Sequence, residues 1–270
     1  MMTELLNKLS ENRRKVMSGI TGIVNLIPQS ELKRTNDAKN YWNLSESNVT
    51  LQDLSHWRGK GRWSDDFAWK AIGEQHFSMY RKLCKLAEVT DQVHSMIEWG
   101  PGGGANVTYF SKEFETIYGI DISSPNLDEC ERQLKQNGYA GFKKVLFSAD
   151  NPESCLHMVT SNVDFFLSTA VYQHFPSKEY GIKVTNLAYR VLSDQGIAII
   201  QIRYEDGSNK VTSKTRNYHR HAIAFTSYTI EEFWEIVTKI GFSPIGIYLK
   251  PESNYAYYFL KKGDREWQDL

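Results

Sequence analysis

Apolar and polar positions divide the chain into two parts. In residues 1 to about 90, apolar residues recur at helical spacing, as in Leu5, Leu6 and Leu9, and strand-like runs are absent. Beyond them, short apolar runs (95–99, 116–120, 144–148, 163–168 and 196–202) alternate with stretches of helical period (106–114, 126–137 and 183–192). This alternation predicts a parallel sheet with helices on both faces.

The C-terminal end predicts a helix followed by two strands. Thr229 and Glu232 form a capping box before an apolar periodic segment that Gly241 ends. Strand-like runs follow at 243–248 and 255–260, separated by a turn-rich segment. We expect an antiparallel hairpin at one edge of the sheet. The expected organisation is a helical N-terminal cap over residues 1–88 and an α/β domain over residues 89–270.

The most informative stretch is a glycine-rich loop after the run 95–99. Gly100, Gly102 and Gly104 let the backbone turn sharply and approach a ligand closely. About twenty residues after the first glycine, Asp121 follows the next apolar run. A carboxylate at the tip of a second strand can accept hydrogen bonds from both ribose hydroxyls. The pattern favours a nucleoside-containing ligand.

These residues also carry a family resemblance. Glu98-x-Gly100-x-Gly102-x-Gly104 and the segment 117–123 resemble the first two motifs of class I S-adenosylmethionine-dependent methyltransferases. Segments 147–150, 163–176 and 191–202 resemble later motifs, so the likeness spans about residues 90–262. It implies a Rossmann-like, doubly wound, mostly parallel seven-stranded sheet with one antiparallel strand.

The resemblance implies a binding site for S-adenosylmethionine. The three glycines would line the amino-acid part of the cofactor, Asp121 would bind the ribose and Asp150 the adenine. The full expected set is Glu98, Gly100, Gly102, Gly104, Asp121, Ile122, Asp150 and Ser168. The loop also fits the glycine pattern of dinucleotide-binding proteins. Glu98, the position of the loop deep in the chain and the late hairpin favour the methyltransferase interpretation.

Candidate catalytic residues follow the fourth predicted strand and lie in the polar segment 205–229. A general base is needed when the methyl acceptor is an alcohol or phenol, whereas an amine can lose its proton after attack. Tyr172 and His174 stand closest to the strand end, and His219 lies in the long segment. Each has a structural alternative, as a hydrogen-bonding or solvated residue. His219 and His221 alone do not form a metal site, so we expect no metal.

Aromatic and basic residues gather in the cap. Trp57, Arg58, Lys60, Arg62 and Trp63 could form a lid over a ligand, or the rings could pack helices onto the main domain. Basic and aromatic residues together are also found in RNA-binding proteins.

Composition narrows the choice of acceptor. Lys and Arg balance Asp and Glu at 32 each, which disfavours nucleic acid as the main partner. We therefore expect a small-molecule acceptor such as a sugar, lipid precursor or natural-product intermediate. An RNA methyltransferase and a non-catalytic regulatory protein are the alternatives. Three widely spaced cysteines, the absence of a long charge-free apolar run and the absence of an export signal indicate a cytoplasmic protein, while the oligomeric state stays open.

Overall fold

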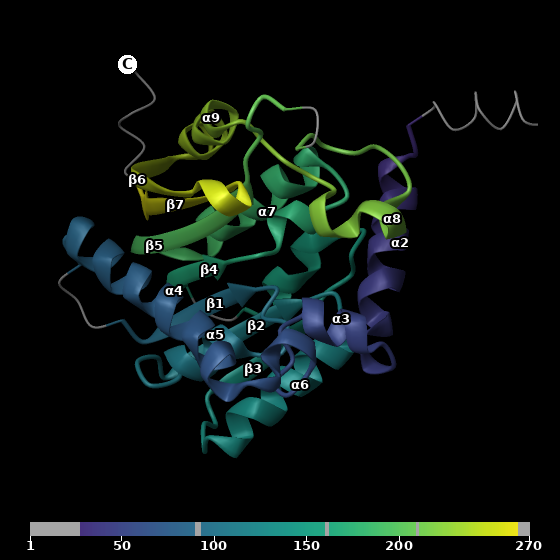
Figure 1. The fold of residues 1–270 in the computed structure, drawn as a ribbon. Helices are drawn as coiled ribbons and strands as arrows, with labels where there is room; N and C mark the ends of the chain where they lie inside the picture. The colour runs from purple at the N-terminus through teal and green to yellow at the C-terminus, as the bar shows by residue number, and fades with distance from the viewer. Residues whose placement is uncertain (1–27, 90–92, 160–161, 209–210, 264–270) are drawn as a thin grey trace, which may run out of the picture.

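The computed structural model describes residues 28–89, 93–159, 162–208 and 211–263. The apolar repeats predicted as helical between Leu5 and Val24 lie outside these ranges. The described residues form an α/β sandwich, in which the helices over residues 31–54 lie at one end of the sheet and the helix over residues 66–86 packs on one of its faces (Figure 1).

Seven strands form a single sheet in the order β3-β2-β1-β4-β5-β7-β6. They are β1 Ser95–Trp99, β2 Thr116–Asp121, β3 Phe142–Leu146, β4 Val163–Ser168, β5 Leu192–Arg203, β6 Phe242–Lys250 and β7 Tyr255–Lys262. Strands β1 to β5 pair in parallel, whereas β7 pairs antiparallel with β5 on one side and β6 on the other. The predicted doubly wound sheet with one antiparallel strand and a late hairpin is confirmed.

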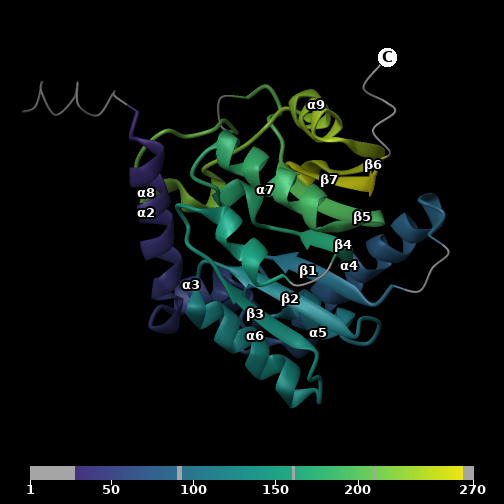
Figure 2. The same cartoon turned by 180° about the vertical axis from the view of Figure 1, so that it is seen from behind.

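Helices cover both faces of the sheet (Figures 1 and 2). The α-helices are α2 Glu31–Asn43, α3 Val49–Leu54, α4 Asp66–Leu86, α5 Ala105–Phe110, α6 Ser124–Gln136, α7 Lys178–Val191, α8 Tyr218–His221 and α9 Ile230–Ile240. Short 3-10 helices lie at Leu44–Glu46, Gly61–Ser64, Pro152–His157, Tyr172–His174, Ala222–Ala224 and Pro251–Ser253.

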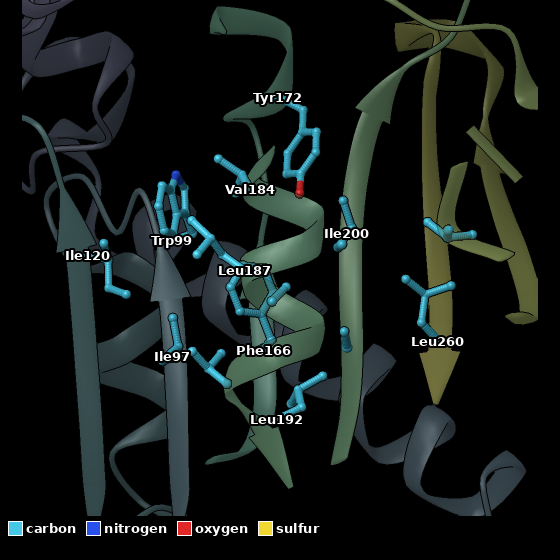
Figure 3. Packing of buried hydrophobic residues seen from close by; sticks show 14 of the residues in the cluster. Ile97, Trp99, Ile120, Phe166, Tyr172, Val184, Leu187, Leu192, Ile200 and Leu260 are labelled. Carbon is cyan, nitrogen blue, oxygen red and sulfur yellow. The ribbon is translucent and has the colours of Figure 1, made fainter. Parts of the chain in front are cut away.

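Successive side chains along a buried strand point to opposite faces of the sheet. Ile97 and Phe166 pack in the cluster that includes α7 and α9, and Figure 3 shows them with Leu187 of α7. Met96 and Phe165 pack in the opposite cluster, with residues of α4, α5 and α6. Because both faces are buried, the central strands β1, β2 and β4 read as mostly apolar runs in the sequence.

The start and end of α9 follow its local sequence. Thr229 Oγ1 accepts from the Glu232 amide, and the Glu232 carboxylate accepts from the Thr229 amide, which is the predicted capping box. Gly241 adopts a left-handed conformation with φ of 116°, which ends the helix. The segment leads directly into β6.

The N-terminal helices approach the sheet where the parallel strands end. Helix α2 lies beside α8 in both views, and Ala38 packs with Tyr218 and Ala222 (Figures 1 and 2). The side-chain Nδ2 of Asn43 donates to Ile122 O at 3.2 Å, and Ser123 Oγ donates to Trp42 O at 3.0 Å. These bonds fix the end of α2 against the tip of β2.

Candidate functional site

The glycine loop lies between β1 and α5, at the carboxyl ends of the strands. Gly100 has φ of 75°, and a Cβ atom there would lie 2.4 Å from Val171 Cγ2. Gly104 has φ of 88° and caps α5. Both positions require glycine because a side chain would strain the backbone, and at Gly100 it would also collide with Val171.

Asp121 ends β2 beside this loop and is buried. Its Oδ1 accepts from the Ser123 amide at 2.9 Å. Burial raises the pKa of Asp121 to about 6, while hydrogen bonds from the Ser123 and Ile122 backbone act in the opposite sense. Asp121 is therefore mainly ionised at neutral pH, and it can accept hydrogen bonds from a ligand.

The loop and Asp121 open onto a cavity of about 740 Å³, including its opening to solvent. Sheet tips and cap line it together: Thr35, Ala38, Trp42, Leu54, Ser55, His56, Trp99, Gly100, Gly102, Ile120, Asp121, Ile122, Asn126, Phe147, Ala149, Thr169, Ala170, Val171, His174, Phe175, Pro176, Tyr180 and Tyr218. None of these lining residues is lysine or arginine, and Asp121 is the one carboxylate among them.

The cap touches the glycine loop directly through the segment 55–57, called the strap below. The Gly103 amide donates to Ser55 O at 2.7 Å. A Cβ atom on Gly102 would lie 2.4 Å from Ser55 O, and one on Gly103 would lie 2.6 Å from His56 O. Gly102 and Gly103 are therefore needed for contact with the strap.

A second contact joins α2 to the polar segment 205–229. Trp42 Nε1 donates to the Tyr218 hydroxyl at 3.0 Å, and that hydroxyl donates to His174 O at 2.6 Å. The rings of Trp42 and His174 lie 4.9 Å apart. The sequence offers His219 of this segment as a candidate catalytic residue, and the structure places Tyr218 of the same segment in the cavity wall.

His174 lines the cavity and has a defined tautomer. Its Nδ1 lies 2.6 Å from Ala222 O, which can only accept, so Nδ1 carries the proton of the neutral ring and Nε2 carries the lone pair. Burial lowers the pKa of His174 to about 4, which the carbonyls of Ala222 and Ala170 partly oppose. The ring is neutral at neutral pH.

Two other expected catalytic residues lie away from the cavity. Tyr172 is fully buried in the core, with its hydroxyl 2.9 Å from Thr185 Oγ1 of α7 (Figure 3). His219 is exposed, with Nε2 4.0 Å from Asp37 Oδ1, and it is not among the cavity residues.

The remaining expected cofactor residues divide between the cavity and its surroundings. Ile122 lines the cavity, whereas Glu98 and Ser168 lie beneath it. Ser168 Oγ donates to Trp99 O at 3.2 Å. Asp150 is exposed and accepts from Ser148 Oγ, a hydrogen bond that lowers the pKa of Asp150. At that strand tip, Phe147 and Ala149 line the cavity instead.

Glu98 belongs to a buried polar network under the glycine loop. Its Oε1 accepts from Asn106 Nδ2 at 2.6 Å, and Asn106 also bonds to His76 Nδ1 at 2.8 Å and to Thr169 Oγ1 at 3.1 Å. Burial raises the pKa of Glu98 to about 8. Glu98 therefore ties β1 to α5 and, through Thr169, to the tip of β4.

The basic and aromatic residues of the cap bond to other cap residues and to the main domain, where Trp57 Nε1 donates to Asn126 Oδ1 of α6 at 3.0 Å. Arg58 pairs with Asp66, and Arg62 Nε lies 3.0 Å from Asp53 Oδ2. Trp63 Nε1 donates to Asp53 O at 2.6 Å. None of these basic and aromatic side chains is among the cavity residues, so the arrangement matches the packing alternative for this segment.

Sequence reasoning missed His56, which lines the cavity from the strap. It has φ of 56°, a conformation uncommon for residues other than glycine and found often at functional sites. Ala170, at the opposite wall, has φ of 57°. His56 begins the basic and aromatic segment 56–63, but neither periodicity nor a motif in that segment indicates a role for the histidine itself.

Comparison with known proteins agrees with this geometry. Residues 97–200 match the family described as "Methyltransferase domain". No curated protein gives a significant match. The fold is similar to that of an S-adenosylmethionine-dependent methyltransferase from Clostridium acetobutylicum ATCC 824, with a TM-score of 0.54 and 10% identity over 69% of this chain and 90% of that chain.

Two further structures share the fold. The CcbJ methyltransferase from Streptomyces caelestis aligns with a TM-score of 0.51 and 10% identity, over 68% of this chain and 94% of that chain. The N-methyltransferase NodS from Bradyrhizobium japonicum WM9, in complex with S-adenosyl-L-homocysteine, aligns with a TM-score of 0.50 and 10% identity, over 69% of this chain and 87% of that chain.

Residues 97–200 therefore match a methyltransferase domain, and the described residues share the fold of a known S-adenosylmethionine-dependent methyltransferase. Within the described ranges, no three His, Cys, Asp or Glu side chains are grouped so that they could hold a metal ion. No helix in those ranges is both long enough and apolar enough to cross a membrane.

Proposed function

We propose that this enzyme transfers a methyl group to an uncharged small-molecule acceptor in the cavity between sheet and cap. The observation that carries the proposal is that α2 and the strap cover the carboxyl ends of β1, β2 and β4, and that the described residues lining the cavity include no lysine or arginine. An acceptor that carried a phosphate or carboxylate would lose its hydration there without a cationic partner. The cap, residues 1–88, thereby serves as the acceptor-binding region of the methyltransferase domain, residues 89–270.

We propose S-adenosylmethionine as the cofactor, and the cavity suits it on two counts. Asp121 is a buried carboxylate that faces the cavity, as a ribose diol requires. Gly100 turns with φ of 75° next to it and leaves room that a side chain would take. In this proposal Gly100 and Gly102 lie along the amino-acid part, Asp121 and Ile122 hold the ribose, and Phe147 with Ala149 border the adenine. Glu98, Ser168 and Gly104 support the site from beneath.

The cofactor supplies a methyl group on a sulfonium, so the protein mainly positions the acceptor and excludes water. Trp42, Tyr218 and Phe175 give the cavity aromatic walls against which a flat or apolar acceptor can pack. His174 Nε2, with its lone pair, can accept the hydrogen bond of an acceptor hydroxyl. With a pKa of about 4, His174 is a weak base, so we propose that it orients the hydroxyl more than it removes the proton.

The acceptor can be identified by isotope transfer. Enzyme is incubated with methyl-labelled S-adenosylmethionine and with separate small-metabolite and RNA fractions of a cell extract, and label is followed by mass spectrometry. We expect label in small, uncharged products and none in RNA. Label confined to RNA would overturn the small-molecule proposal. Cofactor binding without transfer to any fraction would favour the non-catalytic regulatory alternative.

The role proposed for His174 predicts a mild effect of its removal. His174→Ala should lower kcat by about tenfold or less and keep S-adenosylhomocysteine binding, whereas loss of a general base costs roughly 10²–10⁴-fold. The pH profile of kcat, measured with the identified acceptor, should keep its acidic limb in the variant. A loss above a hundredfold together with a vanished acidic limb would make His174 the general base instead. His219→Ala, outside the cavity, serves as the matched control and should be near wild type.

A further inference from the structure

We propose that His56, in the cap, binds the amino-acid end of S-adenosylmethionine, so that the cofactor site is completed only by the strap. The inference concerns the cofactor and is independent of which acceptor the enzyme uses. It starts from the position of His56 on the strap, which contacts the glycine loop on one side and the cavity on the other.

The backbone at His56 is held firmly in its left-handed conformation. The amide of His56 donates to Asp53 O at 3.1 Å, and its carbonyl accepts from Trp69 Nε1 at 2.6 Å. The preceding residue, Ser55, accepts from the Gly103 amide. Because these contacts fix both sides of the residue, the position of the imidazole is set before any ligand arrives. Pre-organisation of this kind lowers the entropy cost of binding.

The His56 ring lines the cavity and is half-buried. No residue within the described ranges makes a hydrogen bond to it, and its nearest ring neighbour is Trp63, at a centroid distance of 4.8 Å. An imidazole on a cavity wall that the described residues leave without a partner can bond to a ligand. Arg62, His76, His174 and Asp53 are the charged or titratable groups that act on it.

The polar groups that line the cavity indicate which part of the cofactor His56 faces. The amino-acid end carries a carboxylate, which needs donors and avoids Asp121. His56 and His174 are the imidazoles among the described lining residues, and the N–H of His174 is already bonded to Ala222 O. The neutral ring of His56 keeps an N–H that can donate to the carboxylate, as can the unpartnered Ser55 hydroxyl beside it, and the backbone of the strap that carries both residues contacts the glycine loop.

The test compares two ligands that differ only at the proposed contact. S-Adenosylhomocysteine has the amino-acid end, whereas 5′-methylthioadenosine keeps the nucleoside and thioether but lacks it. The variant is His56→Gly, because glycine accepts the positive φ and removes only the side chain. Calorimetry gives the Kd of each ligand, and the melting temperature without ligand checks the fold. His56→Asn, which also tolerates this conformation and keeps a donor, is measured in parallel.

We expect His56→Gly to weaken S-adenosylhomocysteine binding about tenfold or more, as for a lost hydrogen bond to a charged group. Binding of 5′-methylthioadenosine should change by less than about threefold, and His56→Asn should recover part of the loss. His94→Gln, a change at an exposed histidine bonded to Glu115 and outside the cavity, should leave both affinities unchanged.

Several results would overturn the proposal. Equal weakening of both ligands would mean that His56 acts on the nucleoside or only on the cap fold. Unchanged affinity for both would mean that the ring does not reach the cofactor. A wild-type protein that binds neither ligand would overturn the cofactor assignment itself, and that result is distinguishable from a failure confined to His56.

Discussion

At the residue scale, Asp121 carries the strongest expectation. Asp121→Asn should weaken S-adenosylhomocysteine binding by about 1.5–3 kcal/mol, because hydrogen bonds to a charged acceptor are lost. The melting temperature without ligand should stay the same or rise, since a desolvated carboxylate is removed from a buried site. Calorimetry and thermal unfolding on the same samples measure both. An unchanged Kd would mean that the ribose binds elsewhere and not at Asp121.

The same carboxyl predicts a pH dependence of cofactor binding. The pKa of Asp121 is raised to about 6, so its acceptor capacity falls when the pH drops through that value. Affinity for S-adenosylhomocysteine should therefore weaken between pH 7 and pH 5 in the wild type and change less in Asp121→Asn. A wild-type affinity that rises on acidification would contradict this role.

Glu98 makes a prediction about stability. Its pKa is about 8 in the folded protein against an ordinary value of 4.5, so the folded state holds a proton that the unfolded state releases between these values. The contribution of the Glu98 carboxyl to the free energy of unfolding is fully present below pH 4.5 and is lost as the pH rises to about 8. Near pH 6.5 the unfolded forms of His56, His76 and His174, with an ordinary pKa of 6.5, still release protons, and folded Asp121, with a pKa of about 6, completes its titration. These groups are common to the wild type and to Glu98→Gln, so the difference between the two proteins over pH 6.5–8 isolates Glu98.

The melting temperature of the ligand-free protein should therefore fall from pH 6.5 to pH 8. Glu98→Gln should abolish this fall, since the amide is neutral throughout and can still accept from Asn106. Glu113→Gln, at a partly exposed surface ion pair with Arg81, is the control and should keep the wild-type slope. A wild-type melting temperature that is flat or rising over this range would show that Glu98 is ionised in the folded protein.

At the element scale, the contact between strap and glycine loop can be broken at one position. Gly102→Ala places a Cβ atom 2.4 Å from Ser55 O at φ of 52°, so both steric clash and backbone strain oppose it. Gly138→Ala is the matched control: φ is 74°, and nothing lies within 4 Å of the added atom. The control should cost about 1–2 kcal/mol from strain alone.

We expect Gly102→Ala to destabilise the fold more than Gly138→Ala does, and to weaken S-adenosylhomocysteine binding while the control leaves it intact. Denaturant unfolding and calorimetry provide the two measurements. Equal destabilisation with equal affinity would mean that the strap moves away from the loop without consequence for the cofactor.

The elements themselves were largely predictable from the sequence. Strands β1, β2 and β4 were predicted to within a residue, because strands buried on both faces read as apolar runs. Strand β3 was expected at 144–148 and lies at Phe142–Leu146. Only Val145 is fully buried in β3, at the sheet edge, so its apolar signal is weak and its bounds shift.

The site was predictable only where it is local in the chain. The glycine loop and Asp121 lie within about twenty residues of each other, so one local sequence motif predicts both. The contact between Trp42 and Tyr218 joins residues 176 apart, and the strap reaches the loop from a separate helical segment. Such contacts depend on how α2 and α3 pack on the sheet, which periodicity does not encode.

At the scale of the whole molecule, the helical cap and the sheet tips form one site. The cap contributes Thr35, Ala38 and Trp42 from α2, and it contributes the strap after α3. The chain carries no net charge at neutral pH, and the cavity residues include no lysine or arginine. This combination supports an enclosed reaction on a neutral substrate over capture of a polyanion.

The most direct test of this account is calorimetric titration of the whole chain with S-adenosylhomocysteine and, separately, with NAD. We predict that S-adenosylhomocysteine binds at one site per chain, that Asp121→Asn weakens this binding, and that NAD gives no binding heat. Binding of NAD together with no binding of S-adenosylhomocysteine would contradict the account, because the glycine loop and Asp121 would then serve a dinucleotide.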